Sequence, residues 1–398
     1  MEEINNILKN EAVSKDDKER AVLEVANFLI KEGRFDPQNV KQNINIEQNM
    51  NLLTFSQNLR SLWPDLTAAR ASKILKKITD LLPNSNYKDA LPYVNEMIQW
   101  SDQKYLKLFY ETKKVAMLYE LREFTQCLKN IKILHGDLKK MNDKLNLINL
   151  YIYESKTYFE LENMTRAKAS LTSARALAVT TFCPFYIQSQ IELLAGMYSC
   201  EEGNYFISYN HYIEALDGFN QYKMVNECIL TLRYIILSYI ILNKWGDLKN
   251  ILSKKITQPY VNDKIVKILL LLAESVKNKD LSTFDKEIQE NLDILNDTFI
   301  LSHLTYLKDI LLDANILKLI EPYLNVSITF LAEKLNFPVA AIEAKLRTLI
   351  LDKKISGILD YYTNTLVLYE KVEMTETENN QLETMKMIVR SIKAGTSE

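Results

Sequence analysis

Glycine and proline are both scarce in this sequence, with eight of each among 398 residues. Sheet-rich folds use glycine in tight turns, and phosphate-binding loops use it where the backbone approaches a ligand. The few glycines are scattered, and the sequence contains no GxGxxG motif, P-loop or GxSxG elbow. The sequence therefore predicts a mostly helical protein without a phosphate-binding loop or a serine-hydrolase elbow.

Residue types that carry metal and acid–base chemistry are also rare or dispersed. The sequence has no HExxH or HxH motif and no CxxC pair, and no two carboxylates stand out as an acid–base couple. We therefore predict that the protein is not an enzyme and that it has no catalytic, cofactor-binding or metal-binding residues. We expect its cysteines to be buried, reduced thiols. The histidines and cysteines are His135, His211, His303, Cys127, Cys183, Cys200 and Cys228.

The formal net charge of −2 provides no overall field to attract nucleic acid or an anionic membrane. The first 17 residues are polar and acidic, unlike a secretory signal. The most apolar stretch, residues 229–242, contains Arg233 and is too short to span a bilayer. These features predict a soluble, intracellular protein.

Amphipathic helices follow one another from about residue 21 to residue 319, with apolar residues at three- and four-residue spacing. Anchor residues near helix ends recur at steps of 38, 39, 40 and 41 residues, and a bulky residue begins the next helix five to seven residues later. This period is typical of helix–turn–helix repeats, and an irregular helical bundle is the alternative. The pairs are Leu81 and Tyr87, Tyr119 and Phe124, Tyr158 and Met164, Tyr198 and Tyr205, and Tyr239 and Trp245.

A shorter unit follows once the repeat pattern ends after Asn315. One helix closes at Pro322, a second begins at Ser327 and a third begins near Pro338. Two short apolar runs around a polar tip then predict a hairpin, and three helices followed by a hairpin form a winged helix. The predicted architecture is all-α, with an N-terminal segment (1–20), a right-handed TPR-like helical-repeat solenoid (21–310), a winged helix (311–371), a linker (372–381) and a C-terminal helix (382–394).

The C-terminal helix has one apolar stripe, formed by Leu382, Met385, Val389 and Ile392 at spacings of three and four residues. Such a stripe is typical of a coiled-coil or bundle contact. The alternative is that the helix folds back on its own domain. The sequence leaves both interpretations open.

Winged helices often bind DNA, so the charge of the cap bears on its function. A recognition helix presents Arg and Lys to a groove. Residues 327–371 contain six basic and five acidic residues, which leaves little net charge to bind phosphates. The hairpin is instead rich in Ile, Leu, Val and Tyr, and an apolar edge strand of this kind can pair with a strand of a neighbour. The cap is therefore predicted to bind protein.

Six segments of the sequence resemble the PCI-domain subunits of the proteasome lid. The PCI domain is a helical array that leads into a winged helix, and subunits of the proteasome lid, the COP9 signalosome and a translation initiation factor share it. The similarity covers roughly residues 21–392. Its segments are 138–144 (LKKMNDK), 154–158 (ESKTY), 166–175 (RAKASLTSAR), 212–219 (YIEALDGF), 320–323 (IEPY) and 349–360 (LILDKKISGILD).

This resemblance implies a non-catalytic scaffold of the regulatory-particle lid, located in the cytoplasm and nucleus and needed for ubiquitin-dependent protein degradation. The implied partners are other PCI-domain lid subunits, the lid deubiquitinase module, the ATPase ring and the outer ring of the core particle, with no cofactor, nucleic acid or membrane. A PCI subunit of the COP9 signalosome and a nucleic-acid-binding PCI protein are the alternatives. For a lid subunit we predict a cap-to-cap interface at Val326, Ile358, Leu366 and Leu368 and a bundle interface at Leu382, Met385, Val389 and Ile392.

Overall fold

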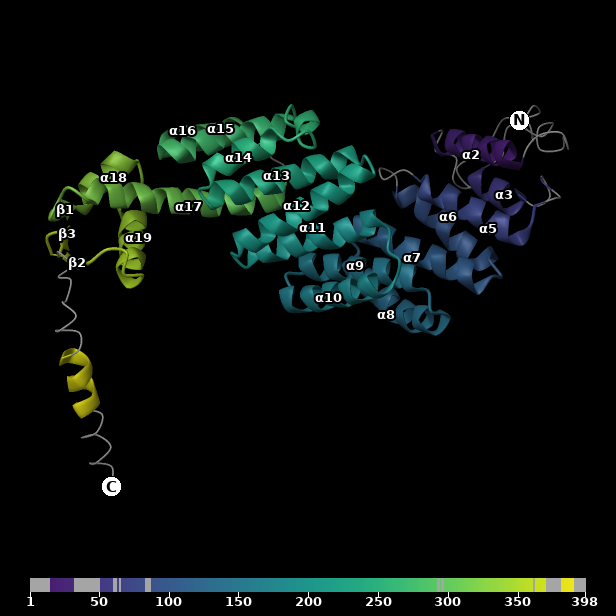
Figure 1. The fold of residues 1–398 in the computed structure, drawn as a ribbon, viewed down its shortest axis with the longest axis horizontal. Coiled ribbons are helices and arrows are strands. Elements are labelled where there is room, and N and C mark those ends of the chain that lie inside the picture. The colour runs from purple at the N-terminus through teal and green to yellow at the C-terminus, as the bar shows by residue number, and fades with distance from the viewer. Residues whose placement is uncertain are drawn as a thin grey trace, which may run out of the picture. The chain divides into compact units, whose positions relative to one another are not determined.

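The computed structural model describes residues 15–31, 51–59, 63, 66–82, 87–291, 294, 297–360, 362–369 and 381–389. The chain divides into two compact units, residues 1–238 and 239–398. Helices form nearly all of the described secondary structure, and one small three-stranded sheet lies near the C-terminal end (Figure 1). The predicted fold class, a helical-repeat array followed by a winged helix, is confirmed.

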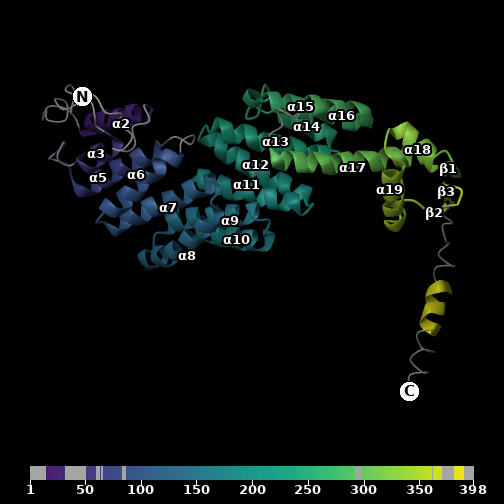
Figure 2. The ribbon, with the colours of Figure 1, turned by 180° about the vertical axis from the view of Figure 1, so that it is seen from behind.

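The first unit is a series of helices joined by short connections. Helices α7 to α13 each contain 17 or 18 residues. Consecutive helices pack as hairpins, most extensively α9 with α10 and α11 with α12, which lie side by side in both views (Figures 1 and 2). The helices are α2 (Lys15–Lys31), α3 (Leu52–Gln57), α5 (Ala68–Asp80), α6 (Tyr87–Trp100), α7 (Lys104–Glu120), α8 (Phe124–Met141), α9 (Lys144–Glu160), α10 (Met164–Thr180), α11 (Phe185–Glu201), α12 (Tyr205–Gln221) and α13 (Val225–Ile241).

The same type of turn joins the two helices of three hairpins: α7 with α8, α9 with α10, and α11 with α12. Arg122, Glu162 and Gly203 adopt positive φ angles of 59°, 58° and 80°, and the residue after each donates its N–H to a carbonyl five residues earlier. This is the Schellman arrangement, which satisfies carbonyls at a helix end. The five bulky residues predicted to open helices are each the first residue of one, namely Tyr87 of α6, Phe124 of α8, Met164 of α10, Tyr205 of α12 and Trp245 of α14 (Trp245–Leu252).

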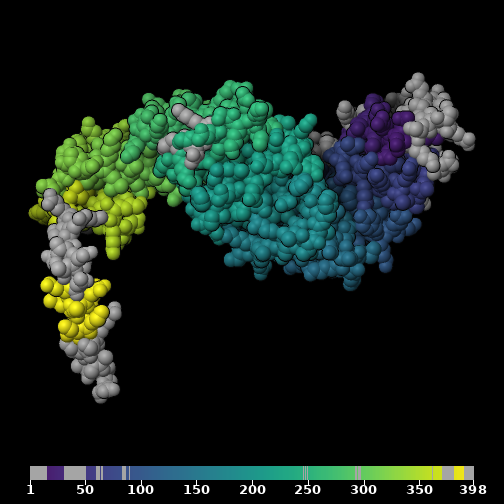
Figure 3. Space-filling view, viewed as in Figure 1, coloured from purple at the N-terminus to yellow at the C-terminus, as the bar shows by residue number. Residues whose placement is uncertain are grey.

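Small side chains allow the helices of the first unit to approach closely. Ala167 and Ala174 of α10 are fully buried, and the Ser155 hydroxyl donates to the Ala167 carbonyl at 2.8 Å. Gly196 of α11 faces the buried ring of Tyr212, and a Cβ atom at Gly196 would lie 2.5 Å from that ring. Side chains fill the space between the ribbons of this unit in the space-filling view (Figure 3). The close contact of α11 with α12 therefore depends on a residue without a side chain.

The second unit continues with helices and ends in the winged-helix cap. Helix α17 runs without interruption across the predicted boundary at residues 310 and 311, because its apolar residues continue through Leu311 and Leu312 into Ile316. The elements that follow α14 are the 3-10 helix η3 (Gln258–Tyr260), α15 (Lys264–Asn278), α16 (Leu281–Glu290), α17 (Thr298–Ile320), β1 (Asn325–Ser327), α18 (Ile328–Leu335), α19 (Val339–Leu351), β2 (Gly357–Asp360) and β3 (Thr365–Leu368).

The cap contains the predicted helices and hairpin, together with a strand that the sequence pattern did not predict. Ser327 and Pro338 are the N-cap residues of α18 and α19. The sheet has the order β1–β3–β2, with both neighbouring pairs antiparallel. Strand β1 has only three residues, so no alternation of polar and apolar residues could identify it.

Two further features bear on the predictions from composition. Cys127, Cys200 and Cys228 are buried, whereas Cys183 is half-buried. Within the described parts of the chain, no helix combines the length and the apolar character needed to cross a membrane.

Candidate functional site

Strand β3 is the central strand of the cap sheet, which corrects the predicted placement of two edge residues. Leu366 and Leu368 belong to this strand and therefore do not lie at an edge. Val326 of β1 pairs in register with Leu366, and both side chains are buried. The packing of Val326 and Leu366 thus contributes to the core of the cap. The error arose because β1, which covers the far side of β3, was absent from the predicted hairpin.

Strands β1 and β2 form the two edges of the sheet, and Ile358 of β2 is 55% exposed. The Tyr369 N–H donates to the Ser356 carbonyl at 2.9 Å, which fixes the alternation of hydrogen bonds along this pair of strands. Along a strand of an antiparallel pair, the backbone N–H and C=O groups of successive residues point alternately toward the partner strand and away from it. The backbone groups of Gly357 and Leu359 therefore point away from β3. Of the four predicted residues, Ile358 is the one whose side chain is exposed at this edge.

Asp360 at the end of β2 organises the turn that follows. Its carboxylate accepts hydrogen bonds from the Thr363 hydroxyl at 2.6 Å and from the Tyr362 N–H at 2.9 Å. These hydrogen bonds, the one from Thr363 first, lower the pKa of Asp360 below its ordinary value. Tyr362 itself is 97% exposed at the tip of the hairpin. The wing is therefore held in shape by Asp360, and Tyr362 lies at its tip as a large exposed side chain.

Residues 381–389 form the predicted C-terminal helix, and every residue of this segment is exposed. Met385 and Val389 of the predicted stripe are 66% and 52% exposed, and Ile388 adds a further apolar side chain at 57%. An isolated helix of this length is marginally stable in water, because few hydrogen bonds offset the cost of nucleation. Ile392 and residues 372–380 of the predicted linker (372–381) lie outside the described residues.

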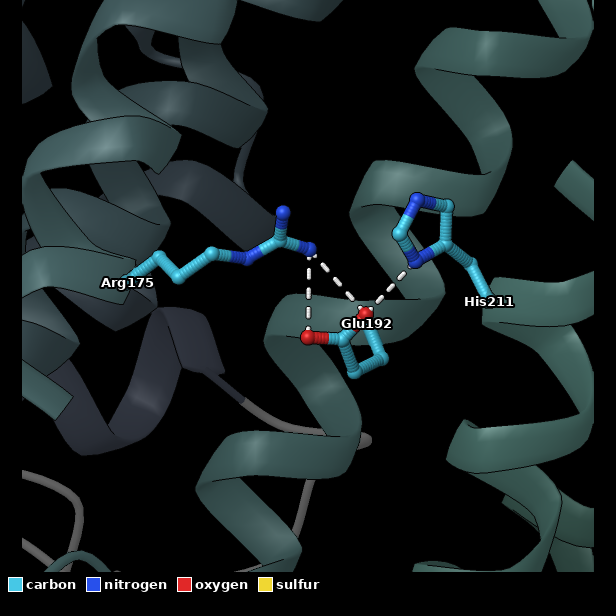
Figure 4. A network of polar contacts seen from close by, with 3 residues as sticks. All are labelled: Arg175, Glu192 and His211. Carbon is cyan, nitrogen blue, oxygen red and sulfur yellow. Dashed lines mark hydrogen bonds and ion pairs between the residues drawn. The ribbon is translucent and has the colours of Figure 1, made fainter. Parts of the chain in front are cut away.

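A polar network that the sequence did not reveal joins three consecutive helices of the first unit (Figure 4). Arg175 of α10 donates from one guanidinium nitrogen to both carboxylate oxygens of Glu192 on α11, at 3.1 and 3.0 Å. Nδ1 of His211 on α12 lies 2.7 Å from the same carboxylate. Burial raises the pKa of Glu192, but the contacts with His211 and Arg175 outweigh it, so the net pKa is lowered from 4.5. The network therefore favours an ionised glutamate.

The same network contains a set of side chains of the kinds that bind metals. Glu192, His211 and Glu214 bring potential ligand atoms within 4.8 Å of one another, and they are the one such group among the residues described. The Glu192 carboxylate already accepts hydrogen bonds from the Arg175 guanidinium, whose positive charge opposes a nearby cation. The geometry fits an ion-pair clamp between helices. No motif could have indicated it, because its members are 17 and 19 residues apart on different helices.

Comparisons with known proteins agree with this architecture. The PCI domain family matches residues 288–370, which include the cap. A protein named probable 26S proteasome regulatory subunit rpn6, from Schizosaccharomyces pombe, is 28% identical over 95% of this chain and 89% of its own length. The 26S proteasome non-ATPase regulatory subunit 11 of Dictyostelium discoideum is 28% identical over 98% of this chain and 93% of its own length.

A third relative is the 26S proteasome regulatory subunit RPN6 of Saccharomyces cerevisiae, which is 30% identical over 70% of this chain and 65% of its own length. The first two relatives align along nearly the whole chain, so the similarity includes the helical array as well as the cap. The resemblance stated from the sequence segments is confirmed. Residues 288–370 of this chain match the PCI domain family, and nearly the whole chain is similar to the 26S proteasome regulatory subunits named rpn6 and non-ATPase regulatory subunit 11.

Proposed function

We propose that this chain is a non-catalytic scaffold subunit of the proteasome regulatory-particle lid. In this role it holds the lid to the ATPase base and to the outer ring of the core particle during ubiquitin-dependent protein degradation in the cytoplasm and nucleus. Its direct neighbours are other PCI-domain lid subunits and the lid deubiquitinase module. The nearly full-length similarity to proteasome regulatory subunits supports membership of the same assembly.

The observation that carries the proposal is the exposure of the apolar side chains on the described part of the C-terminal helix. Burial of apolar surface contributes about 25 cal/mol per Å², and large exposed apolar patches mark interaction sites. Met385, Ile388 and Val389 are all more than half exposed. A helix with such a stripe gains stability when other helices cover it, and a shared helical bundle provides this cover.

The β2 edge supplies the second proposed contact. The outward backbone groups of Gly357 and Leu359 form the hydrogen-bonding edge that strand addition requires. A Cβ atom at Gly357 would lie 2.6 Å from the Val367 carbonyl oxygen, so this glycine preserves the pairing of β2 with β3. We propose that the caps of neighbouring lid subunits meet at this edge, with Ile358 buried between them.

The two alternatives receive less support. The three relatives named above are all proteasome regulatory subunits, which favours the proteasome over the COP9 signalosome. Six basic and five acidic residues between positions 327 and 371 leave the cap nearly neutral. Binding of nucleic acid depends on neutralising phosphates with an excess of positive charge, so a nucleic-acid-binding role is disfavoured.

A double substitution in the C-terminal helix tests the bundle contact. We expect Met385→Asp with Val389→Asp to reduce co-purification with lid subunits at least tenfold, because two charges would be buried in an apolar seam. The control is Thr384→Asp with Lys386→Asn, which lowers the net charge by the same amount as the Met385/Val389 variant but at polar positions of the same helix. The readouts are quantitative mass spectrometry of affinity-purified complexes and the urea unfolding of each free variant. Normal incorporation of the Met385/Val389 variant would refute the bundle contact.

Native mass spectrometry of complexes purified through the wild-type chain tests the choice of assembly. Proteasome peptidase and ATPase subunits are the expected companions. Recovery of signalosome subunits in their place would contradict the proposal. The nucleic-acid alternative predicts a salt-sensitive gel shift with the purified chain at physiological ionic strength, and we expect none.

A further inference from the structure

One edge of the first unit carries an exposed apolar side chain at each successive helix connection. The four connections are α6–α7, α8–α9, α10–α11 and α12–α13, and together we call them the apolar edge. Single exposed apolar residues are common on protein surfaces, but a contiguous row marks an interaction site. Its exposed apolar and aromatic residues are Trp100, Tyr105, Met141, Leu145, Val179, Phe182, Phe185, Tyr222, Met224 and Val225.

Contacts within the unit show that these connections are neighbours. Tyr105, Met141, Leu145 and Thr181, from three different connections, line one shallow depression. The fourth connection joins the row through Tyr222, whose ring lies 5.8 Å from that of Tyr186 at the start of α11. The apolar edge is therefore one surface.

The most exposed residues of the row lie at its α10–α11 connection. Phe182 is 93% exposed and Val179 is 83% exposed. Complete burial of a phenylalanine side chain contributes about 1.5–3 kcal/mol. The fold of the unit leaves this stabilisation unused at Phe182, so a partner that covers this side chain would gain it.

The charge of the apolar edge differs from that of the opposite edge. Each connection is taken together with the three adjacent residues of the helix on either side. The four connections of the apolar edge then contain five lysines and three acidic residues. The connections α7–α8, α9–α10 and α11–α12 at the opposite edge, counted in the same way, carry six glutamates and two arginines. Exposed Lys104, Lys139 and Lys223 have no salt-bridge partner among the described residues. The apolar row thus lies among lysines that remain available to carboxylates.

We propose that the apolar edge binds an acidic protein segment whose apolar side chains cover Phe182 and its neighbours while its carboxylates pair with the lysines. Apolar burial then supplies most of the affinity, and the charges supply orientation and a faster association rate. This surface belongs to the first unit, whereas the proposed lid contacts belong to the cap and the C-terminal helix. The inference therefore goes beyond the proposed function and does not depend on it.

Two other occupants fit the observations less well. Nucleic acid requires a denser positive surface, and the three acidic residues among the lysines oppose phosphate binding. A second copy of this chain would have to present its glutamate-rich edge, where exposed apolar side chains do not recur at every connection. The test below gives each of these occupants a distinct outcome.

The experiment uses the full chain and a short fluorescein-labelled peptide in which pairs of acidic residues alternate with Leu-Phe pairs. We expect fluorescence anisotropy to report saturable binding that Phe182→Ser weakens at least tenfold, or about 1.4 kcal/mol. The exposed residue Ile133 lies within α8, so Ile133→Ser is the apolar control and is expected to leave binding unchanged. Circular dichroism checks that each variant is folded.

The charge contribution has its own matched pair of variants. The double substitution Lys104→Glu with Lys139→Glu is expected to weaken binding of the acidic probe at least tenfold. Arg122→Glu with Arg166→Glu makes the same change in net charge at the opposite edge. This control is expected to leave binding of the probe unchanged. A probe with lysine in place of its acidic residues, or with serine in place of Leu and Phe, is expected not to bind. The proposal would be overturned if either altered probe bound as tightly as the acidic Leu-Phe probe. It would also be overturned if all variants bound the acidic probe with the affinity of the wild-type chain.

The remaining outcomes identify the other occupants. Tight binding of a labelled oligouridylate at physiological salt, lost in the Lys104/Lys139 variant, would assign the apolar edge to nucleic acid and overturn the proposal. Self-association in analytical ultracentrifugation that Phe182→Ser abolishes would assign it to a second copy. A lid that assembles normally while the acidic probe fails to bind would refute this inference alone. If the chain bound the acidic probe but did not assemble into a lid, only the proposed function would be refuted.

Discussion

The helices of the first unit and the C-terminal helix share one sequence pattern but differ in what covers it. Both carry apolar residues at spacings of three and four. In α9 and α12 those residues, such as Ile148 and Phe219, are fully buried by neighbouring helices, whereas Met385 and Val389 are exposed. The pattern therefore predicts a helix and its apolar face. Whether that face is covered by the same chain depends on how many helices are close enough to pack against it.

The largest expected effect comes from removing a large side chain in the packed region. Phe219→Ala should destabilise the first unit by about 3–5 kcal/mol, because it removes buried apolar surface and leaves a cavity. Met387→Ala in the exposed C-terminal helix should change the unfolding free energy by less than about 0.5 kcal/mol. Urea denaturation monitored by circular dichroism measures both. Equal effects would mean that the C-terminal helix packs on its own chain, and the contrast between the two regions would then be lost.

Two glycines in helices provide the second prediction. Gly196→Ala should destabilise the protein by about 1–3 kcal/mol, because the new methyl group would overlap the buried ring of Tyr212. Gly136→Ala in α8 meets no atom within 4 Å, and the higher helix propensity of alanine should stabilise the protein by up to about 1 kcal/mol. Thermal denaturation distinguishes the two signs. Stabilisation by both substitutions would show that α11 and α12 can move apart without cost.

A buried hydrogen bond gives the third prediction. The Ser155 and Tyr198 hydroxyls lie 2.6 Å apart inside the repeat, and burial raises the pKa of Tyr198. Ser155→Ala should cost about 1–3 kcal/mol, because it leaves the Tyr198 hydroxyl buried without this partner. Adding Tyr198→Phe should recover part of that loss, and a double-mutant cycle measures the coupling. A coupling of zero would mean that another group satisfies the tyrosine.

The smallest expected effect is a pH dependence that arises from Glu192. Its pKa in the folded state is lowered, so the stabilisation is present above the ordinary pKa of 4.5 and disappears as the pH falls through the lowered value. Glu192→Gln should therefore be less stable than the wild type near neutral pH and approach it under acid conditions. Urea midpoints measured over that range test the sign. A difference that grows as the pH falls would contradict the clamp between α10, α11 and α12.

Local sequence predicted much of the repeat architecture. The helix starts were identifiable because a bulky residue follows each polar turn, and Phe124, Met164 and Tyr205 do begin helices. The cap helices were identifiable from Ser327 and Pro338, which have strong positional preferences at helix starts. These signals depend on neighbours within a few residues, and a single sequence contains them in full.

The candidate site was less predictable. Strand β1 is too short to show a pattern, so Leu366 and Leu368 were assigned to an edge that β1 in fact covers. The contact between Glu192 and His211 joins different helices and leaves no motif. The apolar edge emerges only when the connections of separate hairpins are placed side by side, because each one alone contains a few ordinary exposed residues.

Local residue patterns specify the helices, their turns and the apolar face of each, since these follow from backbone preferences and residue spacing. The folded chain is needed to establish which apolar faces are buried, which strand is central in the cap and which charged groups meet. Those outcomes depend on contacts between residues far apart in the chain, and their energies arise from burial and geometry that no local pattern specifies. The C-terminal helix shows the distinction most simply, because its stripe is evident in the sequence and its exposure only in the fold.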